Sequence, residues 1–118
     1  MGALDKKVAI VTGAGGGIGR AMSTRFASEG AAVICVDINE ERVNATVEEI
    51  KQNGGQGIAL AADVAIEANA VAAVAEAVDN FGGLHVLVSN AIYDLPLAPL
   101  TEISYDDWRR TMDVNLNS

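Results

Sequence analysis

The feature of this chain best suited to chemistry is a dense run of glycines near its N-terminus. The run, T-G-A-G-G-G-I-G over residues 12–19, directly follows the apolar segment 8–11. A tight turn between a strand and a helix presents several free backbone N–H groups, and the helix dipole favours an anion at the same spot. The pattern therefore predicts a phosphate-binding turn placed between a buried strand and a helix.

Acidic residues follow two later apolar segments. Asp37 ends the segment 32–36, and Asp63 follows the segment 57–61. About two dozen residues separate Asp37 from Gly13, and a carboxylate at that distance from a glycine turn can accept hydrogen bonds from ribose hydroxyls. Either carboxylate could instead cap a helix, and both interpretations stay open for each residue.

Four apolar segments alternate with four helical patterns and would position these residues. The expected strands are residues 8–11, 32–36, 57–61 and 84–88, and valines 71, 74 and 78 mark the third helix. Asn39 and Ser104 are expected to cap the second and fourth helices. Strands this apolar favour a parallel sheet covered on both faces, with the strand order 3-2-1-4. We predict one α/β domain over residues 1–118, a three-layer, doubly wound Rossmann-type sheet.

Composition excludes several classes of partner. The net charge is −8, the isoelectric point is near 4.4 and only eight residues are basic, so nucleic acid and anionic membranes are poor partners. No apolar run approaches the length that spans a membrane. The single cysteine, Cys35, lies in an apolar segment and is expected to be a buried hydrophobe. We expect a cytoplasmic protein without a metal site.

Several motifs together resemble those of the short-chain dehydrogenase/reductase family. They are T-G-x-x-x-G-x-G at residues 12–19, Asp37, Asp63-Val64, Asn90-Ala91 and D-V-N-L at residues 113–116, and they follow the family's order along nearly the whole chain. The resemblance implies an oxidoreductase that transfers hydride between a nicotinamide cofactor and a small alcohol or carbonyl substrate.

The resemblance also implies which residues bind the cofactor. These are the glycine turn with Gly13, Gly16, Gly17, Ile18 and Gly19 at the pyrophosphate, Asp37 and Ile38 at the adenosine ribose, Asp63 and Val64 at the adenine, and Asn90 and Ala91 near the nicotinamide ribose. Asp37 would repel a 2′-phosphate, and neither residue 38 nor residue 39 is basic, so we expect NAD rather than NADP. Ser89 and Ile92 depart from the family's N-N-A-G, so we expect the loop beside the nicotinamide ribose to differ from the family's.

Asn115 matches the asparagine of the family's catalytic group, in which its backbone carbonyl holds a proton-relay water. A surface helical asparagine is the alternative interpretation. In the family, the catalytic serine and the Tyr-x-x-x-Lys follow this asparagine, and this sequence contains no counterpart of them. Tyr105 is not that tyrosine, since it precedes Asn115 and is followed four residues later by Arg109. An arginine is a poor proton shuttle.

His85 is expected to be a packed or hydrogen-bonded histidine rather than a base.

We therefore expect the chain to be the cofactor-binding N-terminal half of a longer, oligomeric enzyme, and to be inactive alone. A non-catalytic dinucleotide-binding or scaffold fragment is the alternative. A regulatory domain for another nucleotide has only the glycine turn in its favour, since the sequence contains no G-K-[ST].

Overall fold

Strands and helices alternate along the chain in the computed structural model, which describes residues 2–95 and 97–118. The elements are β1 (Val8–Thr12), α1 (Gly17–Ser28), β2 (Ala32–Asp37), α2 (Glu40–Gln52), β3 (Gln56–Ala61), α3 (Glu67–Phe81), β4 (Val86–Val88), the 3-10 helix η1 (Leu100–Glu102) and α4 (Tyr105–Asn115).

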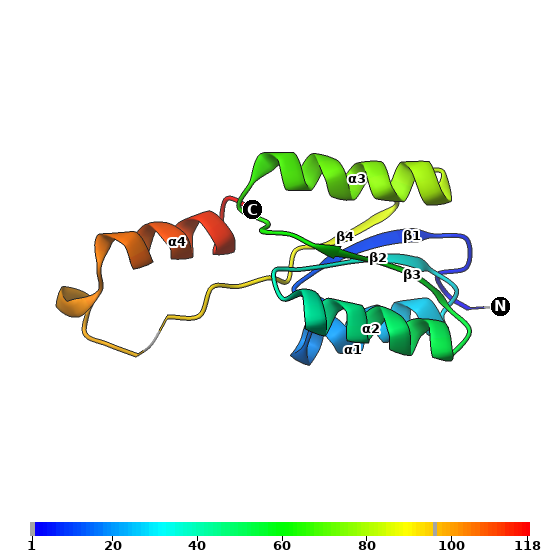
Figure 1. Ribbon diagram of the computed structural model, residues 1–118, viewed down its shortest axis with the longest axis horizontal. Helices are drawn as coiled ribbons and strands as arrows, with labels where there is room; N and C mark the ends of the chain where they lie inside the picture. The colour runs from blue at the N-terminus through cyan, green and yellow to red at the C-terminus, as the bar shows by residue number, and fades with distance from the viewer. Residues whose placement is uncertain (1, 96) are drawn as a thin grey trace.

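The four strands form one parallel sheet in the order β3-β2-β1-β4. Helix α3 covers one face of this sheet, while α1 and α2 cover the other (Figure 1). The predicted fold class and strand order are therefore confirmed. Because all four strands run the same way, their carboxyl ends and the loops that follow meet at one edge of the sheet.

The core lies on both faces of β1 and β2, whose residues are almost all buried. Alternate side chains point to opposite faces, so Val11 and Cys35 pack with residues of α2, whereas Ile10 and Ile34 pack with residues of α3. This two-sided burial explains why the strands read as continuous apolar runs without a polar face.

Helix α3 forms where the valine spacing predicts it, but the valines do not form its buried face. Val71, Val74 and Val78 are exposed, whereas Ala73 and Ala77 are buried against the sheet. Small side chains let the helix axis approach the strands closely, and close packing favours that face over the larger valines.

Strand β4 is shorter than the predicted segment 84–88, and His85 explains the difference. The imidazole Nδ1 of His85 accepts a hydrogen bond from the Val8 backbone N–H at 2.9 Å, while the His85 N–H donates to the Val8 carbonyl at 2.9 Å. The side chain thus takes the place of a backbone acceptor, and regular pairing begins only at Val86. The prediction of a hydrogen-bonded histidine is confirmed.

The helix ends carry the expected caps. The Asn39 side chain accepts a hydrogen bond from the Arg42 N–H at 3.0 Å, and the Ser104 hydroxyl accepts one from the Asp107 N–H at 3.1 Å. Gly82 ends α3 in the left-handed conformation, with φ of 82°. Within residues 2–95 and 97–118, every helix is too short or too polar to cross a lipid bilayer.

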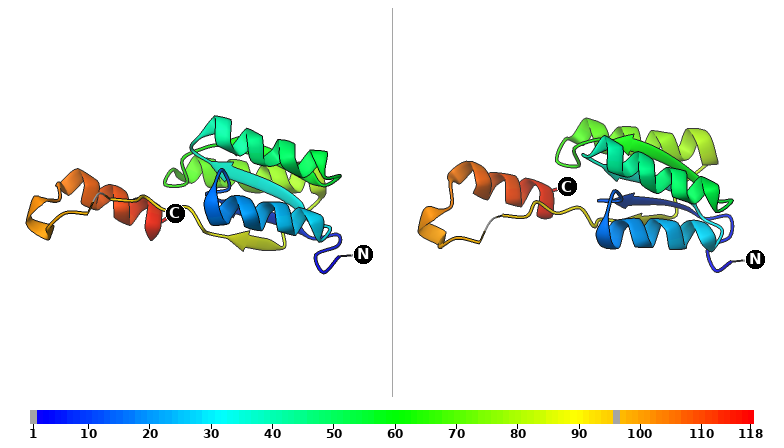
Figure 2. Two further views of the ribbon diagram at one scale, coloured as in Figure 1. Left: turned by 90° about the horizontal axis from the view of Figure 1, so that it is seen from below. Right: turned by 60° about the horizontal axis from the view of Figure 1, so that its bottom comes forward.

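Helix α4 does not pack on the sheet. It projects beyond the carboxyl edge and gives the molecule its elongated outline of 52 × 24 × 24 Å (Figures 1 and 2). Val114 is the one buried residue of this helix. Residues 91–93 of the loop after β4 and the C-terminal half of α4 border a space beside the strand ends.

Candidate functional site

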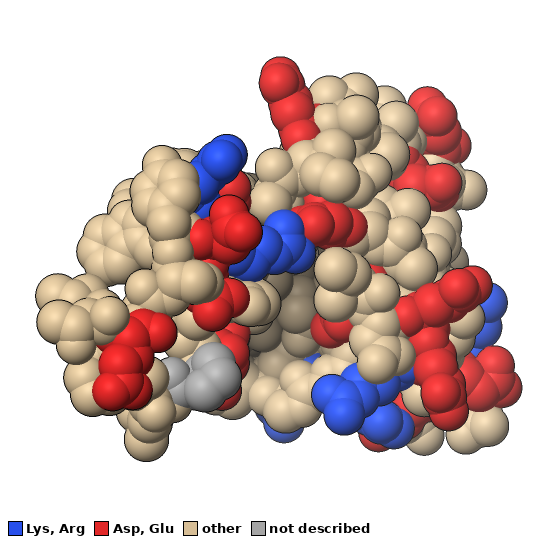
Figure 3. Space-filling model, turned by 60° about the vertical axis from the view of Figure 1, so that its left-hand side comes forward, with Lys and Arg blue, Asp and Glu red and all other residues tan. Residues whose placement is uncertain are grey.

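A cavity of about 270 Å³ opens at the carboxyl edge of the sheet. Its lining comes from the loops after all four strands and from α4: Gly13, Asp37, Ile38, Ala62, Asp63, Val64, Ala91, Ile92, Tyr93, Arg110 and Val114. Figure 3 shows a hollow between the projecting part and the body of the molecule, with acidic and basic side chains around it. The crevice outside the strand ends is the usual ligand site of an open α/β sheet.

The glycine turn between β1 and α1 is packed so closely that side chains are excluded from it. Gly13 has φ of +67°, and a Cβ there would lie 2.9 Å from the Asn90 Nδ2. A Cβ on Gly19 would lie 1.9 Å from the Gly13 carbonyl oxygen. Gly17, with φ of +53°, has open space where its Cβ would point. One side of the turn is therefore filled by protein and the other side is open to a ligand.

The N-terminus of α1 suits an anion at that open side. Gly16 is the N-cap residue and provides no side-chain hydrogen bond, and the first turn contains no acidic residue. Its N–H groups thus lack a side-chain acceptor, and the helix dipole adds partial positive charge. Ile18 is largely exposed here and does not line the cavity. A phosphate would accept hydrogen bonds from these N–H groups, and its negative charge would be attracted by the partial positive charge of the helix end.

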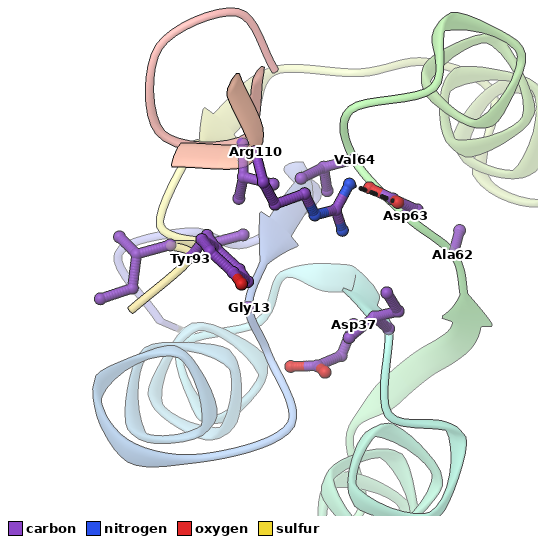
Figure 4. A pocket seen from close by; sticks show the side chains of 11 residues that line it. Gly13, Asp37, Ala62, Asp63, Val64, Tyr93 and Arg110 are labelled. Atoms are coloured by element: carbon purple, nitrogen blue, oxygen red, sulfur yellow. Dashed lines mark ion pairs between the residues drawn. The ribbon is translucent and has the colours of Figure 1, made fainter. Parts of the chain in front are cut away.

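The Asp37 carboxylate connects the end of β2 to the glycine turn. Its Oδ2 accepts a hydrogen bond from the Gly15 N–H at 2.9 Å, and its Oδ1 accepts one from the Asn39 N–H at 2.9 Å. The cap of α2 is Asn39 rather than Asp37. Two carboxylate oxygens have about four acceptor sites between them, so Asp37 can still accept hydrogen bonds from a ligand in the cavity. Figure 4 shows this carboxylate beside the loop that contains Gly13.

Arg42 is a basic residue near the turn that the sequence interpretation missed. A Cβ on Gly15 would lie 2.9 Å from the Arg42 Cβ, and a Cβ on Gly16 would lie 3.9 Å from its Nη1. The two residues directly after Asp37, at positions 38 and 39, are not basic. One turn of α2 brings position 42 back over the glycine turn, which helical periodicity could have indicated.

Asp63 takes part in an ion pair across the cavity. Its Oδ2 lies 2.8 Å from the Arg110 Nη1 (Figure 4), and its Oδ1 accepts a hydrogen bond from the Ala65 N–H at 2.9 Å. Helix α3 begins later, with Ile66 as its N-cap, so Asp63 does not cap it. Partial burial opposes ionisation, but the Ala65 N–H and the Arg110 guanidinium outweigh it and hold the pKa of Asp63 below its ordinary value.

Asn90 links the end of β4 to the glycine turn rather than lining the cavity. Its Nδ2 donates to the carbonyl oxygens of Thr12 at 3.2 Å and of Gly13 at 3.4 Å. The Thr12 hydroxyl oxygen accepts hydrogen bonds from the N–H groups of Asn90 at 3.0 Å and Ala91 at 3.1 Å. These bonds fix the position of Ala91, which does line the cavity.

Asn115, the last residue of α4, is bound through its side chain. Its Oδ1 accepts a hydrogen bond from the Tyr93 N–H at 2.6 Å, and its Nδ2 donates to the Tyr93 carbonyl oxygen at 3.3 Å. The Tyr93 hydroxyl donates to the Asp107 carboxylate at 3.1 Å. Asn115 is therefore anchored to the loop after β4, although it is solvent-exposed and lies outside the cavity lining.

The cavity thus brings together part of the predicted set: Gly13, Asp37, Ile38, Asp63, Val64 and Ala91. Gly16, Gly17, Ile18 and Gly19 form the adjoining turn and helix start. Sequence reasoning missed Tyr93 and Arg110, because no local pattern shows that a tyrosine after β4 and an arginine in α4 face the same space. Within the described residues, 2–95 and 97–118, no group of three His, Cys, Asp or Glu side chains could hold a metal ion.

Comparison with known proteins agrees with this geometry. The model of the family described as "short chain dehydrogenase" matches residues 7–118. The chain belongs to this family. Nicotinamide dinucleotides are the general cofactors of short-chain dehydrogenases. The open glycine turn, the uncapped helix end and the Asp37 acceptor fit such a group.

Curated short-chain dehydrogenases resemble the chain along nearly all of its length. The 3beta-hydroxysteroid dehydrogenase of Mediterraneibacter gnavus is 42% identical to this chain. The matched region includes 100% of this chain and 43% of that protein. The cyclohexanol dehydrogenase of an Acinetobacter species is 40% identical, over 97% of this chain and 45% of that protein. The chain therefore spans less than half the length of these relatives.

Solved structures show the same likeness. A short-chain dehydrogenase/reductase from Serratia marcescens superposes with a TM-score of 0.89 at 40% identity, covering 97% of this chain and 46% of that one. A further short-chain dehydrogenase/reductase, described as putative, from Burkholderia xenovorans gives 0.90 at 37% identity, covering 99% and 48%. The fold of this chain is thus that of the corresponding part of these enzymes.

Proposed function

We propose that this chain binds NAD at the carboxyl edge of its sheet, as the cofactor-binding part of an oxidoreductase that interconverts an alcohol and a ketone. The observation that carries the proposal is the Asp37 carboxylate, which is hydrogen-bonded to Gly15 of the glycine turn. One side chain thereby sets the distance between a ribose acceptor and a phosphate-binding turn. The relatives named for a hydroxysteroid and for cyclohexanol favour a hydroxyl-bearing small molecule as the substrate.

Each part of the site would hold one part of the dinucleotide. The glycine turn and the start of α1 would bind the pyrophosphate, Asp37 and Ile38 the adenosine ribose, Asp63 and Val64 the adenine, and Asn90 with Ala91 would border the nicotinamide ribose. The nicotinamide ring, when bound, supplies or accepts the hydride. The exposed Ile92 also lines the cavity, so the nicotinamide side is more apolar than in the family's N-N-A-G loop.

The preference for NAD over NADP rests on the negative charge of Asp37. A 2′-phosphate placed against this carboxylate would be repelled at close range, whereas two free ribose hydroxyls could both donate to it. Arg42 near the turn works in the opposite direction. Arg42 is exposed to solvent and Asp37 is less exposed, so the carboxylate should dominate.

Asn115 would contribute to catalysis through its position rather than through contact with the cavity. Both side-chain bonds to Tyr93 fix the last turn of α4, and a fixed turn could hold a relay water at the Asn115 carbonyl. The sequence contains no Tyr-x-x-x-Lys. We therefore expect this chain alone to bind the dinucleotide without turnover.

We also propose a cytoplasmic location and a homo-oligomer. Sedimentation of the native protein would test the oligomeric state.

Titration of the protein with NADH, followed by nicotinamide fluorescence, tests the proposed function. Asp37→Ala removes charge-assisted hydrogen bonds of roughly 1.5–3 kcal/mol, so NADH affinity should fall about 10- to 100-fold. Glu40→Ala, which removes a neighbouring exposed carboxylate in the first turn of α2, is the matched control and should leave the affinity nearly unchanged. Equal NADH affinity in the Asp37 variant and the unmodified protein would contradict the proposal.

A further inference from the structure

Between α4 and the strand-end loops, residues 2–95 and 97–118 provide mainly polar contacts. Trp108, Met112 and Leu116 are 50%, 38% and 68% exposed, and Val114 is the buried residue of the helix. Within the described residues, the charged and hydrogen-bonded groups that reach α4 set its position relative to the strand-end loops.

Arg110 connects α4 to the loop after β3. Its guanidinium is 2.8 Å from the Asp63 carboxylate in the loop after β3, and it lies over the Tyr93 ring, 5.9 Å from the ring centre. Tyr93 in turn bonds through its backbone to Asn115. Figure 4 shows Arg110 extending between Tyr93 and Asp63 across the cavity. One side chain thus joins two strand-end loops to the helix.

The neighbouring Arg109 has a different environment. Its guanidinium lies over Tyr105 of the same helix, 6.0 Å from the ring centre, and the residue does not line the cavity. The two arginines are adjacent in sequence and carry the same charge. A contribution of helix charge in general would therefore be shared by both, whereas an effect that crosses the cavity belongs to Arg110.

We propose that Arg110 is a positioning residue that couples the adenine end of the dinucleotide site to helix α4, so that ligand bound beside Asp63 orders α4 and, with it, Asn115. This inference rests on the proposed function. The side chains of Arg110 and Asp63 are 34% and 20% exposed. A ligand that covers the pair removes water from both charges. The attraction between them then rises, and separating them would leave a desolvated charge unpaired, so the ligand favours the position of α4 in which the pair is formed.

Hydrogen exchange of the backbone amides of residues 105–115, with and without saturating ADP-ribose, tests the coupling. ADP-ribose lacks the nicotinamide but keeps the ribose that would border Asn90 and Ala91. The same measurement with ADP, which lacks that ribose as well, leaves only the adenosine and pyrophosphate side and should give the same protection of α4. In the unmodified protein and in Arg109→Met, the ligand should slow exchange in α4 about tenfold. In Arg110→Met the slowing should disappear, and in Arg110→Lys it should return in part because the charge is restored.

Two kinds of result separate the coupling from the proposed function. If ADP-ribose binds Arg110→Met and still protects α4, or if it binds the unmodified protein without protecting α4, the coupling is wrong and the binding site stands. If ADP-ribose binds none of the four proteins, the proposed function fails and the coupling fails with it. Exchange of the β1 and β2 amides, unchanged in every variant, would show that the fold is intact.

Discussion

Asp37 and Arg42 carry opposite charges and lie close to the same glycine turn, so they would act in opposite directions on a substituent at the ribose 2′ position. The Asp37 carboxylate is an anion bonded to the Gly15 N–H, while the Arg42 guanidinium lies close to the same turn. A free hydroxyl can donate to the carboxylate, whereas a phosphate would pair with the guanidinium. The proposed preference for NAD is therefore a balance between two residues, and removal of either charge should shift it.

Asp37→Asn should raise NADPH affinity by about tenfold relative to NADH, because the repulsion disappears while the shape and one acceptor oxygen remain. Adding Arg42→Gln should remove most of that gain, since the cation that pairs with the 2′-phosphate is then missing. Equilibrium titrations of both cofactors against the two variants measure the ratio. An unchanged NADPH affinity on adding Arg42→Gln would show that Arg42 does not face the 2′ position.

Cys35 should be inert toward thiol reagents in the folded protein. The side chain is completely buried in β2, and burial raises the pKa of its thiol to about 11, despite a hydrogen bond with Ser23 that lowers it. The reactive thiolate is then scarce at neutral pH and inaccessible. A maleimide added to native protein should leave Cys35 unmodified, while the same reagent in urea should modify it fully. Rapid labelling without denaturant would contradict this burial.

Local patterns identified some site residues and not others. Gly13 and Asp37 could be predicted because a turn without side chains and an acidic strand end each leave a signature within a few neighbouring residues. Arg110 and Tyr93 leave none, since they meet Asp63 only after the strands have been placed beside one another. The position of Asn115 was predictable from its motif, but its two bonds to the Tyr93 backbone were not.

At the scale of elements, α2 and α4 have equivalent caps in different surroundings. Asn39 and Ser104 each accept a hydrogen bond from the backbone N–H three residues later. Helix α2 buries Val43, Val47 and Ile50 in the core, whereas α4 buries only Val114. The loss of a cap should therefore have different consequences in the two helices.

Asn39→Ala should lower the free energy of global unfolding by about 1 kcal/mol, because α2 unfolds together with the sheet. Ser104→Ala should leave the main unfolding transition unchanged. It should instead lower the free energy of local opening of α4 by a similar amount, which is measured as faster hydrogen exchange within that helix. Urea denaturation followed by circular dichroism gives the first quantity. Equal losses of global stability in the two variants would show that α4 unfolds cooperatively with the core.

Local sequence patterns predicted the positions of the strands and helices more accurately than they predicted which face of a helix is buried. Apolar runs placed β1, β2 and β3 to within a residue or so, and the caps placed two helix starts. The buried face of α3 could not be predicted, because alanines and valines share this helix and only the distance to the sheet selects Ala73 and Ala77. The start of β4 was missed because an imidazole replaces a backbone partner.

At the scale of the whole molecule, the sheet with α1, α2 and α3 forms the body, and the site lies where the body meets the projecting α4 (Figure 1). The strand order brings the four strand-end loops to one edge, which is why motifs far apart in sequence line one cavity. The central claim is that this edge holds NAD with its adenosine ribose on Asp37.

A crystal structure of the protein soaked with NADH tests that claim most directly. The account predicts both ribose hydroxyls of the adenosine within hydrogen-bonding distance of the Asp37 carboxylate, and the pyrophosphate against the N–H groups of residues 16–19. It also predicts the adenine ring packed on Val64, with its amino group donating to Asp63. A dinucleotide bound elsewhere, or bound at this edge with its adenosine ribose away from Asp37, would contradict it.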